Sequence, residues 1–231
     1  IEELKFFCQK WDITLCGGHT EITDAVTRPV VTGMMAGTVS RIRLIDKRNM
    51  AKGDRVLLTK GVAVEGTAII AREFGDHLKS LGMNDSEIDS GRRFLANISI
   101  ITEARIAAES DATSAMHDVT EGGLATALEE MATAGQHRIR VHTERIPVFP
   151  QTRKICDLLG IDPMGLIGSG SLLICCRTGA CEAIIESLTR NGIAVTAIGE
   201  VLEPGEGIEA FKDGQCVQWP RFAADEITRL F

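Results

Sequence analysis

Residues 115–132 read AMHDVTEGGLATALEEMA, and this stretch decides the fold of its surroundings. A short apolar run ends, two glycines follow, and apolar side chains then recur at i, i+3, i+4 and i+7, namely Leu124, Ala127, Leu128 and Met131. That spacing is typical of one face of an amphipathic helix. The stretch therefore predicts a strand, a tight glycine turn and a partly buried helix, which is a unit of a mixed strand and helix fold.

The turn also carries side chains suited to phosphate chemistry. The free amides and the dipole of a helix start attract anions, and Gly122 and Gly123 would let a phosphate approach the backbone beside Thr120. A carboxylate facing phosphate needs a cation between them, so we expect Asp118 to be a Mg²⁺ ligand and a catalytic residue. The alternative is that Asp118 or Thr120 is an ordinary helix N-cap and the glycines only form a turn. The local sequence leaves both interpretations open.

Composition restricts the class of protein. The chain has 231 residues, 44% of them hydrophobic and 25% charged, which is typical of a globular protein. A net charge of −7, 4% aromatics and no tyrosine argue against nucleic-acid binding. No apolar run reaches the ~18 residues of a membrane span. We also expect no signal peptide. Seven cysteines without a CxxC or zinc-type spacing indicate a reducing, cytoplasmic location with free thiols.

The apolar periodicity and the turn residues predict strands and helices along the whole chain. We expect strands at 13–16, 56–59, 114–118, 138–148, 172–176, 193–201 and 207–219, the last a hairpin turning at Asp213-Gly214, and one long or two consecutive strands at 29–45. Helices are expected at the start of the chain, to about residue 74 after the 56–59 strand, at 86–109, directly after the glycine pair through Leu124 to Met131, at 150–160 and 179–191, and at the C-terminus. Mixed strands and helices with hairpin-like pairs favour an α+β fold. Because the first residue is Ile1 and a helix is already under way there, we expect further residues to precede this chain.

Two more loops have candidate side chains. GGHTEIT at 17–23 offers Gly17, Gly18, His19, Thr20 and Glu21, which are either one wall of a nucleotide site or a surface turn. Lys60 follows a strand in LTKGVAVEG, where it either contacts an anionic substrate or is solvated. A zinc cluster of His19, Glu21, His117 and Asp118 is disfavoured, because no two of these residues have the i, i+4 spacing of a helical zinc site. No Walker or GxGxxG motif occurs.

In combination these loops resemble those of the AIR synthase (PurM-like) superfamily. GGHTEIT is similar to its Gly-Gly-x-Thr nucleotide loop, and MHDVTEGGLATALEEMA is similar to the Asp-x-Thr-x-Gly-Gly-Leu helix start of the branch of hydrogenase expression/formation protein HypE. IPVFPQTRKICDLLGIDPMGLIGSGSLLI resembles the same branch, so the likeness covers residues 13–202.

The resemblance implies a PurM-like arrangement in two parts. Residues 1–50 would be the last part of a β-rich N-terminal domain that binds ATP and forms a homodimer, and 51–231 a C-terminal α+β sandwich domain. ATP and Mg²⁺ would lie between them. Asp118 matches the acidic metal ligand, and Gly122 and Gly123 match the phosphate-facing turn. His19, Thr20 and Glu21 match the opposite wall.

Departures from the family narrow the implied function. The early Gly-Asp-Asp-Ala-type metal segment is absent from this chain, Ile167-Gly168-Ser169-Gly170 stands where the branch has an ANEG-like stretch, and Pro220-Arg221 is not followed by a terminal Cys. We expect the full-length protein to be an ATP-dependent enzyme that phosphorylates an amide or carbonyl oxygen of a small-molecule or protein-borne substrate. The alternatives are a kinase of the thiamine-monophosphate kinase type and a non-catalytic nucleotide-binding module.

Overall fold

The computed structural model describes residues 1–231, and the chain divides into two compact units, Ile1–Val39 and Ser40–Phe231. Each unit is described by itself. The expected division into residues 1–50 and 51–231 stays a prediction.

The first unit contains one helix, α1 (Glu2–Lys10). The strands expected at 13–16 and 29–45 are wrong, because 13–39 contain no regular element and the later residues form only the short 3-10 turn η1 (Arg41–Arg43). Strand N–H and C=O groups must be satisfied by a neighbouring strand, and no other segment of the chain pairs with these residues. Their apolar side chains stay exposed, as at Val31 (92%) and Met34 (96%).

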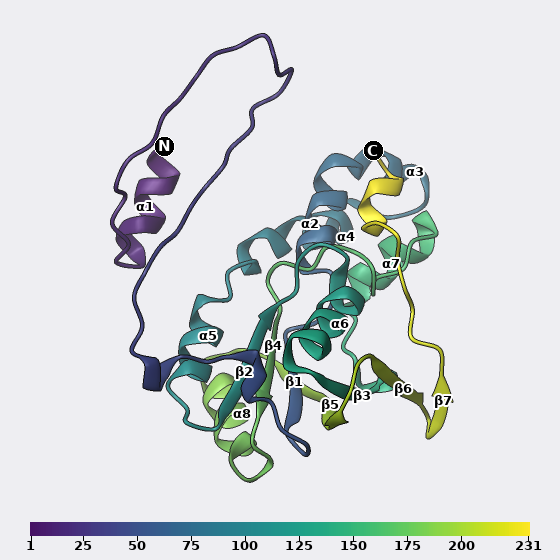
Figure 1. Ribbon diagram of the computed structural model, residues 1–231. Coiled ribbons are helices and arrows are strands. Elements are labelled where there is room, and N and C mark those ends of the chain that lie inside the picture. Colours follow the sequence, from purple (N-terminus) through teal and green to yellow (C-terminus); the bar gives the residue numbers. More distant parts are fainter. The chain divides into compact units, whose positions relative to one another are not determined.

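The second unit is built on one seven-stranded sheet (Figure 1). Its spatial order is β2-β4-β1-β5-β3-β6-β7. The strand bounds are β1 Arg55–Thr59, β2 Thr113–Asp118, β3 His137–His142, β4 Leu172–Cys176, β5 Val195–Pro204, β6 Ile208–Lys212 and β7 Gln215–Val217. All neighbours are antiparallel except β3 and β6, which are parallel. The expected α+β class is therefore confirmed.

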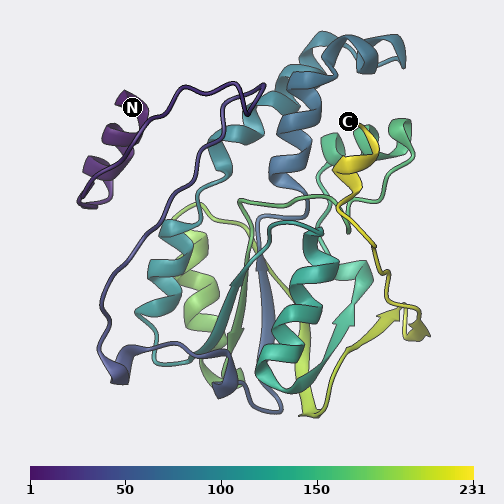
Figure 2. The ribbon, with the colours of Figure 1, turned by 45° about the horizontal axis from the view of Figure 1, so that its top comes forward.

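Both faces of the sheet are covered, because its central strands are apolar at consecutive positions. In β1, Val56 and Leu58 join one buried cluster and Leu57 the other. Figure 2 shows helices α5 (Ile101–Ala108) and α8 (Cys181–Arg190) on one side of the sheet and α6 (Gly123–Gly135) on the other. This alternation at period two produces a central sheet between helical layers.

Helices α2 (Val64–Glu73), α3 (Gly75–Ser80), α4 (Asp85–Arg92) and α7 (Pro150–Leu159) complete the unit. Asn84 and Glu87 form a capping box at the start of α4. The single helix expected over 86–109 is wrong: α4 passes into the 3-10 segment η3 (Arg93–Asn97) and a break before α5. The break has a structural cause, since the carbonyls of Asn97 and Ser99 accept hydrogen bonds from the Lys60 ammonium instead of continuing a helix.

Other local signals are confirmed. Pro150 begins α7, and Gly160 ends it with φ 63°. Asp213 and Gly214 both have positive φ and join β6 to β7. The tail ends in a 3-10 turn, η6 (Glu226–Arg229), rather than in the expected α-helix.

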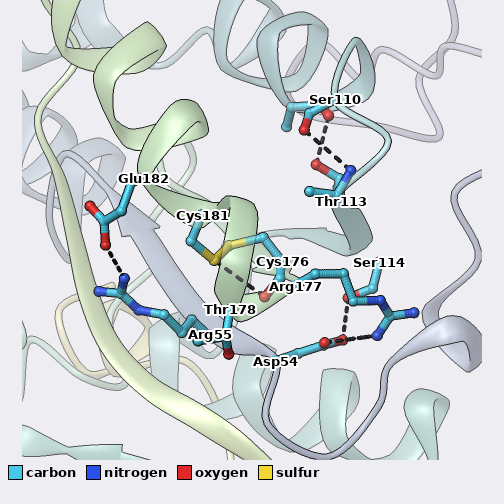
Figure 3. Close-up of a disulfide and its surroundings, with 12 residues drawn as sticks. Asp54, Arg55, Ser110, Thr113, Ser114, Cys176, Arg177, Thr178, Cys181 and Glu182 are labelled. Atoms are coloured by element: carbon cyan, nitrogen blue, oxygen red, sulfur yellow. Dashed lines mark hydrogen bonds and ion pairs between the residues drawn. A yellow bond between two sulfur atoms is a disulfide. The ribbon is translucent and has the colours of Figure 1, made fainter.

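The expectation of free thiols is wrong for one pair, because Cys176 and Cys181 form a disulfide (Figure 3). Cys176 ends β4 and Cys181 begins α8, and the intervening turn η5 (Thr178–Ala180) brings their Cα atoms to 5.6 Å. The sequence gives no sign of this turn, since the spacing matches no standard motif. The other five cysteines are free, and Cys156 and Cys175 among them are buried.

The same end of the sheet is held by a buried carboxylate, drawn in Figure 3. Asp54 is 2% exposed and accepts two hydrogen bonds from Arg177 at 2.6 and 2.7 Å and one from the hydroxyl of Ser114 at 2.6 Å. These contacts join the residue before β1 to the residue after β4 and to β2.

Candidate functional site

The turn from β2 to α6 has the predicted form, but its cap differs from the predicted alternative. Gly122 is the N-cap of α6 with φ 75°, Gly123 follows with φ 62°, and the cap contains no side-chain hydrogen bond. The interpretation of Asp118 or Thr120 as the N-cap is therefore wrong. Two successive positive φ values favour glycine at both positions.

Packing gives a second reason for Gly123. A Cβ at this position would lie 2.5 Å from the carbonyl oxygen of Met164 and 2.9 Å from the amide nitrogen of Leu166. The loop at 164–167 thus packs directly on the head of α6, where the amide of Ala125 donates to the Met164 carbonyl at 3.0 Å. The glycine is required by this approach of protein backbone, whatever else the turn binds.

A carboxylate from the C-terminal tail contacts the head of α6. Asp225 accepts hydrogen bonds from the backbone N–H groups of Gly122 at 2.7 Å, of Ile167 at 3.2 Å and of Ile227 at 2.9 Å. One anionic side chain thus joins the helix start, the 164–167 loop and the first turn of η6. Charge-assisted bonds of this kind are the strong ones, and the helix dipole favours the same charge.

Sequence reasoning missed Asp225. Its only local signal is the order Asp225-Glu226-Ile227, in which an Asp can cap a following turn. Its bonds to Gly122 and Ile167 span 103 and 58 residues.

Asp118 lies at the end of β2 with its side chain 56% exposed. The neighbouring His117 is 11% exposed and lies between two acids: Nδ1 is 3.3 Å from Oδ1 of Asp118, and Nε2 is 3.1 Å from Oε2 of Glu130 on α6. His117 and Glu130 therefore restrict the orientation of Asp118 while leaving part of its carboxylate open to solvent. Sequence reasoning did not pair Glu130 with this group, although Glu130 lies on α6 about two helical turns beyond the glycines.

Thr120 contributes its backbone to the turn. Its carbonyl accepts from the amides of Gly123 at 3.1 Å and Gly168 at 3.3 Å. This links the Gly-Gly pair to the Gly-Ser loop that precedes β4.

Lys60 follows β1 with φ 57° and turns its side chain into the protein. Its Nζ donates to the carbonyls of Asn97 at 2.9 Å, Ser99 at 2.9 Å and Gly170 at 2.8 Å. The same ammonium lies 2.6 Å from the carboxylate of Glu103, a residue only 2% exposed. In this structure Lys60 is fully engaged within the protein, so a substrate role stays a prediction that requires it to exchange these partners.

The remaining predicted residues belong to the first unit. His19 Nε2 lies 3.1 Å from Glu21 Oε2, and these side chains are 82% and 73% exposed. Gly17 and Gly18 have open space at the Cβ position, so packing gives no reason for glycine there.

The oxygen ligands at the turn suit Mg²⁺ that is bound partly by phosphate. They do not suit a metal ion bound entirely by protein side chains. No group of three or more His, Cys, Asp or Glu side chains in the chain is placed to hold a metal ion. Mg²⁺ is commonly bound by one or two carboxylates together with water and substrate phosphates, so the half-open carboxylate of Asp118 fits that mode.

Comparisons with known proteins agree on one family. The family model described as AIR synthase related protein, C-terminal domain, matches residues 51–211. A protein of Methanocaldococcus jannaschii named for hydrogenase expression and formation is 26% identical over 85% of this chain and 56% of its own length. Carbamoyl dehydratase HypE of Cupriavidus necator is 30% identical over 76% of this chain and 48% of its own. The chain thus spans about half the length of these curated relatives.

Solved structures share the fold. The crystal structure of Escherichia coli HypE aligns with a TM-score of 0.63 at 22% identity, over 80% of this chain and 55% of that one. A HypE structure in complex with ATP gives 0.55 at 19% identity, over 76% and 53%. Thiamine-monophosphate kinase of Stenotrophomonas maltophilia gives 0.59 at 16% identity, over 78% and 56%. No helix of this chain has the length and apolar character needed to cross a membrane.

Proposed function

The chain belongs to the family of AIR synthase related proteins, of the HypE branch, and from this premise we propose that it carries the C-terminal domain of an ATP-dependent enzyme. The enzyme activates an amide or carbonyl oxygen, on a small molecule or a protein, by phosphoryl transfer from ATP with Mg²⁺. The observation that carries the proposal is the half-open carboxylate of Asp118, oriented by His117 beside a glycine helix start.

Each residue then has a role. Asp118 would hold Mg²⁺, and His117 with Glu130 keeps the carboxylate of Asp118 oriented. The turn at Gly122 and Gly123 faces the phosphate, where the Asp225 carboxylate already binds the Gly122 amide as an anion of the protein's own. The chemistry that the metal supplies is charge neutralisation on the transferring phosphate.

Residues of the first unit complete the proposal. Gly17, Gly18, His19, Thr20 and Glu21 form the nucleotide side, and His19 is the second catalytic candidate. Support comes from the HypE relatives and from the HypE structure solved with ATP. A homodimer and a cytoplasmic location belong to the same proposal.

The test is phosphate release from ATP by the longest natural form of the protein, with and without Mg²⁺, comparing wild type with Asp118→Asn. We expect Mg²⁺-dependent release that falls at least about a hundredfold in the variant, as for loss of a group that stabilises transition-state charge. Glu121→Gln is the matched control, because Glu121 is an exposed carboxylate three residues away whose side chain forms no hydrogen bond or ion pair in the fold. Equal rates in Asp118→Asn and wild type would refute the role of Asp118.

A second candidate is a kinase of the thiamine-monophosphate kinase type, which the fold match to that enzyme favours. It predicts ATP consumption only with an alcohol or phosphate acceptor and no free phosphate. Nucleotide binding without turnover under either condition would instead indicate a non-catalytic binding module.

A further inference from the structure

A cavity of about 810 Å³ lies beside α7, under the C-terminal tail and away from the Asp118 carboxylate. Its apolar wall comes from distant parts of the chain: Ile146 before α7, Ile161 and Met164 after it, and Trp219 and Phe222 from the tail. The volume is within the range of about 300–1,000 Å³ that is usual for small-molecule sites.

The apolar wall is fixed in position by contacts behind it. The indole N–H of Trp219 donates to the carbonyl of Ala125 at 3.4 Å, and Phe222 packs so closely on Gly165 that a Cβ there would lie 2.5 Å from the ring. The cavity is therefore shaped by the packed fold rather than by loose loop side chains.

The acidic side chains around the cavity already have partners. Glu226 is 8% exposed and accepts from the amide of Asp162 at 2.8 Å and from Arg229 at 2.7 Å. Asp162 in turn accepts from the amide of Met164 at 2.8 Å. Glu144, the third acid, lies 3.7 Å from His142.

Two of the positively charged side chains around the cavity have no acidic partner. Arg153 on α7 and Lys212 at the end of β6 line the cavity, are exposed, and form no ion pair within the chain. The cavity thus offers two free positive charges beside an apolar wall, while its negative charges are engaged.

We propose that this cavity binds a small organic anion, with a ring-sized apolar body against Trp219 and Phe222 and a carboxylate or phosphate group held by Arg153 and Lys212. The two positive charges favour a ligand with a negative charge. The apolar wall favours an organic ligand over an inorganic ion, because only an organic ligand can bury apolar surface against it. This site goes beyond the proposed ATP chemistry and does not depend on it.

The test is titration of the full chain with 1-naphthoate and 1-naphthyl phosphate, followed by ligand-observed NMR. An uncharged probe with the same rings, 1-naphthalenemethanol, reports the apolar contribution alone. We expect saturable binding of the anions and about tenfold weaker binding of the alcohol, as for loss of a charge-assisted contact. The anion that binds more tightly identifies the head group.

The variant Arg153→Gln/Lys212→Gln provides the decisive comparison. It is expected to weaken both anions about tenfold or more and leave the alcohol unchanged, since only the charged contacts are removed. Because both side chains are exposed, the fold is retained, which far-UV circular dichroism checks. Arg72→Gln is the matched control, since Arg72 is an exposed helical arginine without an ion pair and outside the cavity. Anion binding unchanged in the double variant, or equal binding of anion and alcohol to wild type, would overturn the proposal. ATP hydrolysis that fails while this binding persists would count against the proposed function alone.

Discussion

The Asp225 carboxylate joins the C-terminal tail to the head of α6, and we expect its replacement to weaken the fold. In Asp225→Asn the side chain keeps its size and loses its charge. One oxygen of Asp225 accepts from Ile167 and Ile227, and the other accepts from Gly122 at 2.7 Å. An asparagine can keep the first oxygen in place, but its amino group then faces the Gly122 N–H, so that donor loses its acceptor.

The magnitude follows from these contacts. A hydrogen bond to a charged group contributes about 1.5–3 kcal/mol to stability. Loss of the negative charge at the start of α6 removes a further ~0.3–1 kcal/mol of helix-dipole interaction. We therefore expect Asp225→Asn to lower the free energy of unfolding by about 2–4 kcal/mol, and Asp225→Ala by more, because all three amides lose their acceptor. For a domain of this size the loss corresponds to a Tm lower by about 4–16 °C.

The assay is urea unfolding followed by far-UV circular dichroism. Asp157→Asn is the control, because Asp157 is an exposed aspartate on α7 without a hydrogen bond in the fold. We expect the control to stay within about 0.5 kcal/mol of wild type. If Asp225→Asn unfolds at the same urea concentration as Asp157→Asn, the Asp225 carboxylate does not hold the tail on α6, and our account of the turn is refuted.

Three further predictions concern buried groups. Lys60→Met should lower the free energy of unfolding by about 3–5 kcal/mol, because it leaves the Glu103 carboxylate buried without its cation. If the variant unfolds like wild type but has a higher KM, the substrate role of Lys60 is favoured instead. Burial raises the pKa of the Cys156 thiol to about 12 and raises that of Cys175 as well. As the pH rises, the thiols ionise in the unfolded chain before they ionise in the folded one. Stability should therefore fall above about pH 9 by ~1.4 kcal/mol per pH unit for each thiol. Urea unfolding of wild type and Cys156→Ala over a range of pH measures this. Cys181→Ser should cost about 2 kcal/mol, from the entropy of the short loop that the disulfide closes, and an equal midpoint for variant and wild type in urea without reductant would contradict the disulfide.

Local sequence patterns predicted the ends of a helix or strand wherever the residues at those ends determine them. The start of α6 at the glycine pair, Pro150 and Gly160 around α7, and the Asp213-Gly214 hairpin were all predicted correctly. In each case the signal and its structural consequence lie within a few residues, as backbone φ preferences and helix periodicity act locally.

The errors have a common cause: the structure of each segment depends on contacts with residues outside that segment. The 29–45 segment has strand-like residues but no strand to pair with, so its composition did not determine its structure. The predicted 86–109 helix is interrupted by hydrogen bonds from Lys60, a residue 37 positions before Asn97. Asp225 reaches Gly122 across 103 residues. No periodicity in a single sequence encodes such contacts.

The head of α6 allows two roles for Asp225, and they predict different ATP affinities for the same variant. If phosphate takes the place of Asp225 at the Gly122 amide, Asp225 competes with the nucleotide, so Asp225→Asn should tighten nucleotide binding while it loosens the fold. Removal of a competing contact of about 1.4 kcal/mol raises apparent affinity about tenfold. If phosphate instead contacts only Asp118 through Mg²⁺, the same variant should lose stability and bind nucleotide as wild type does. Calorimetric titration of ATP into both proteins separates these cases. Weaker ATP binding in Asp225→Asn would contradict both, since it would require the tail to form part of the nucleotide site.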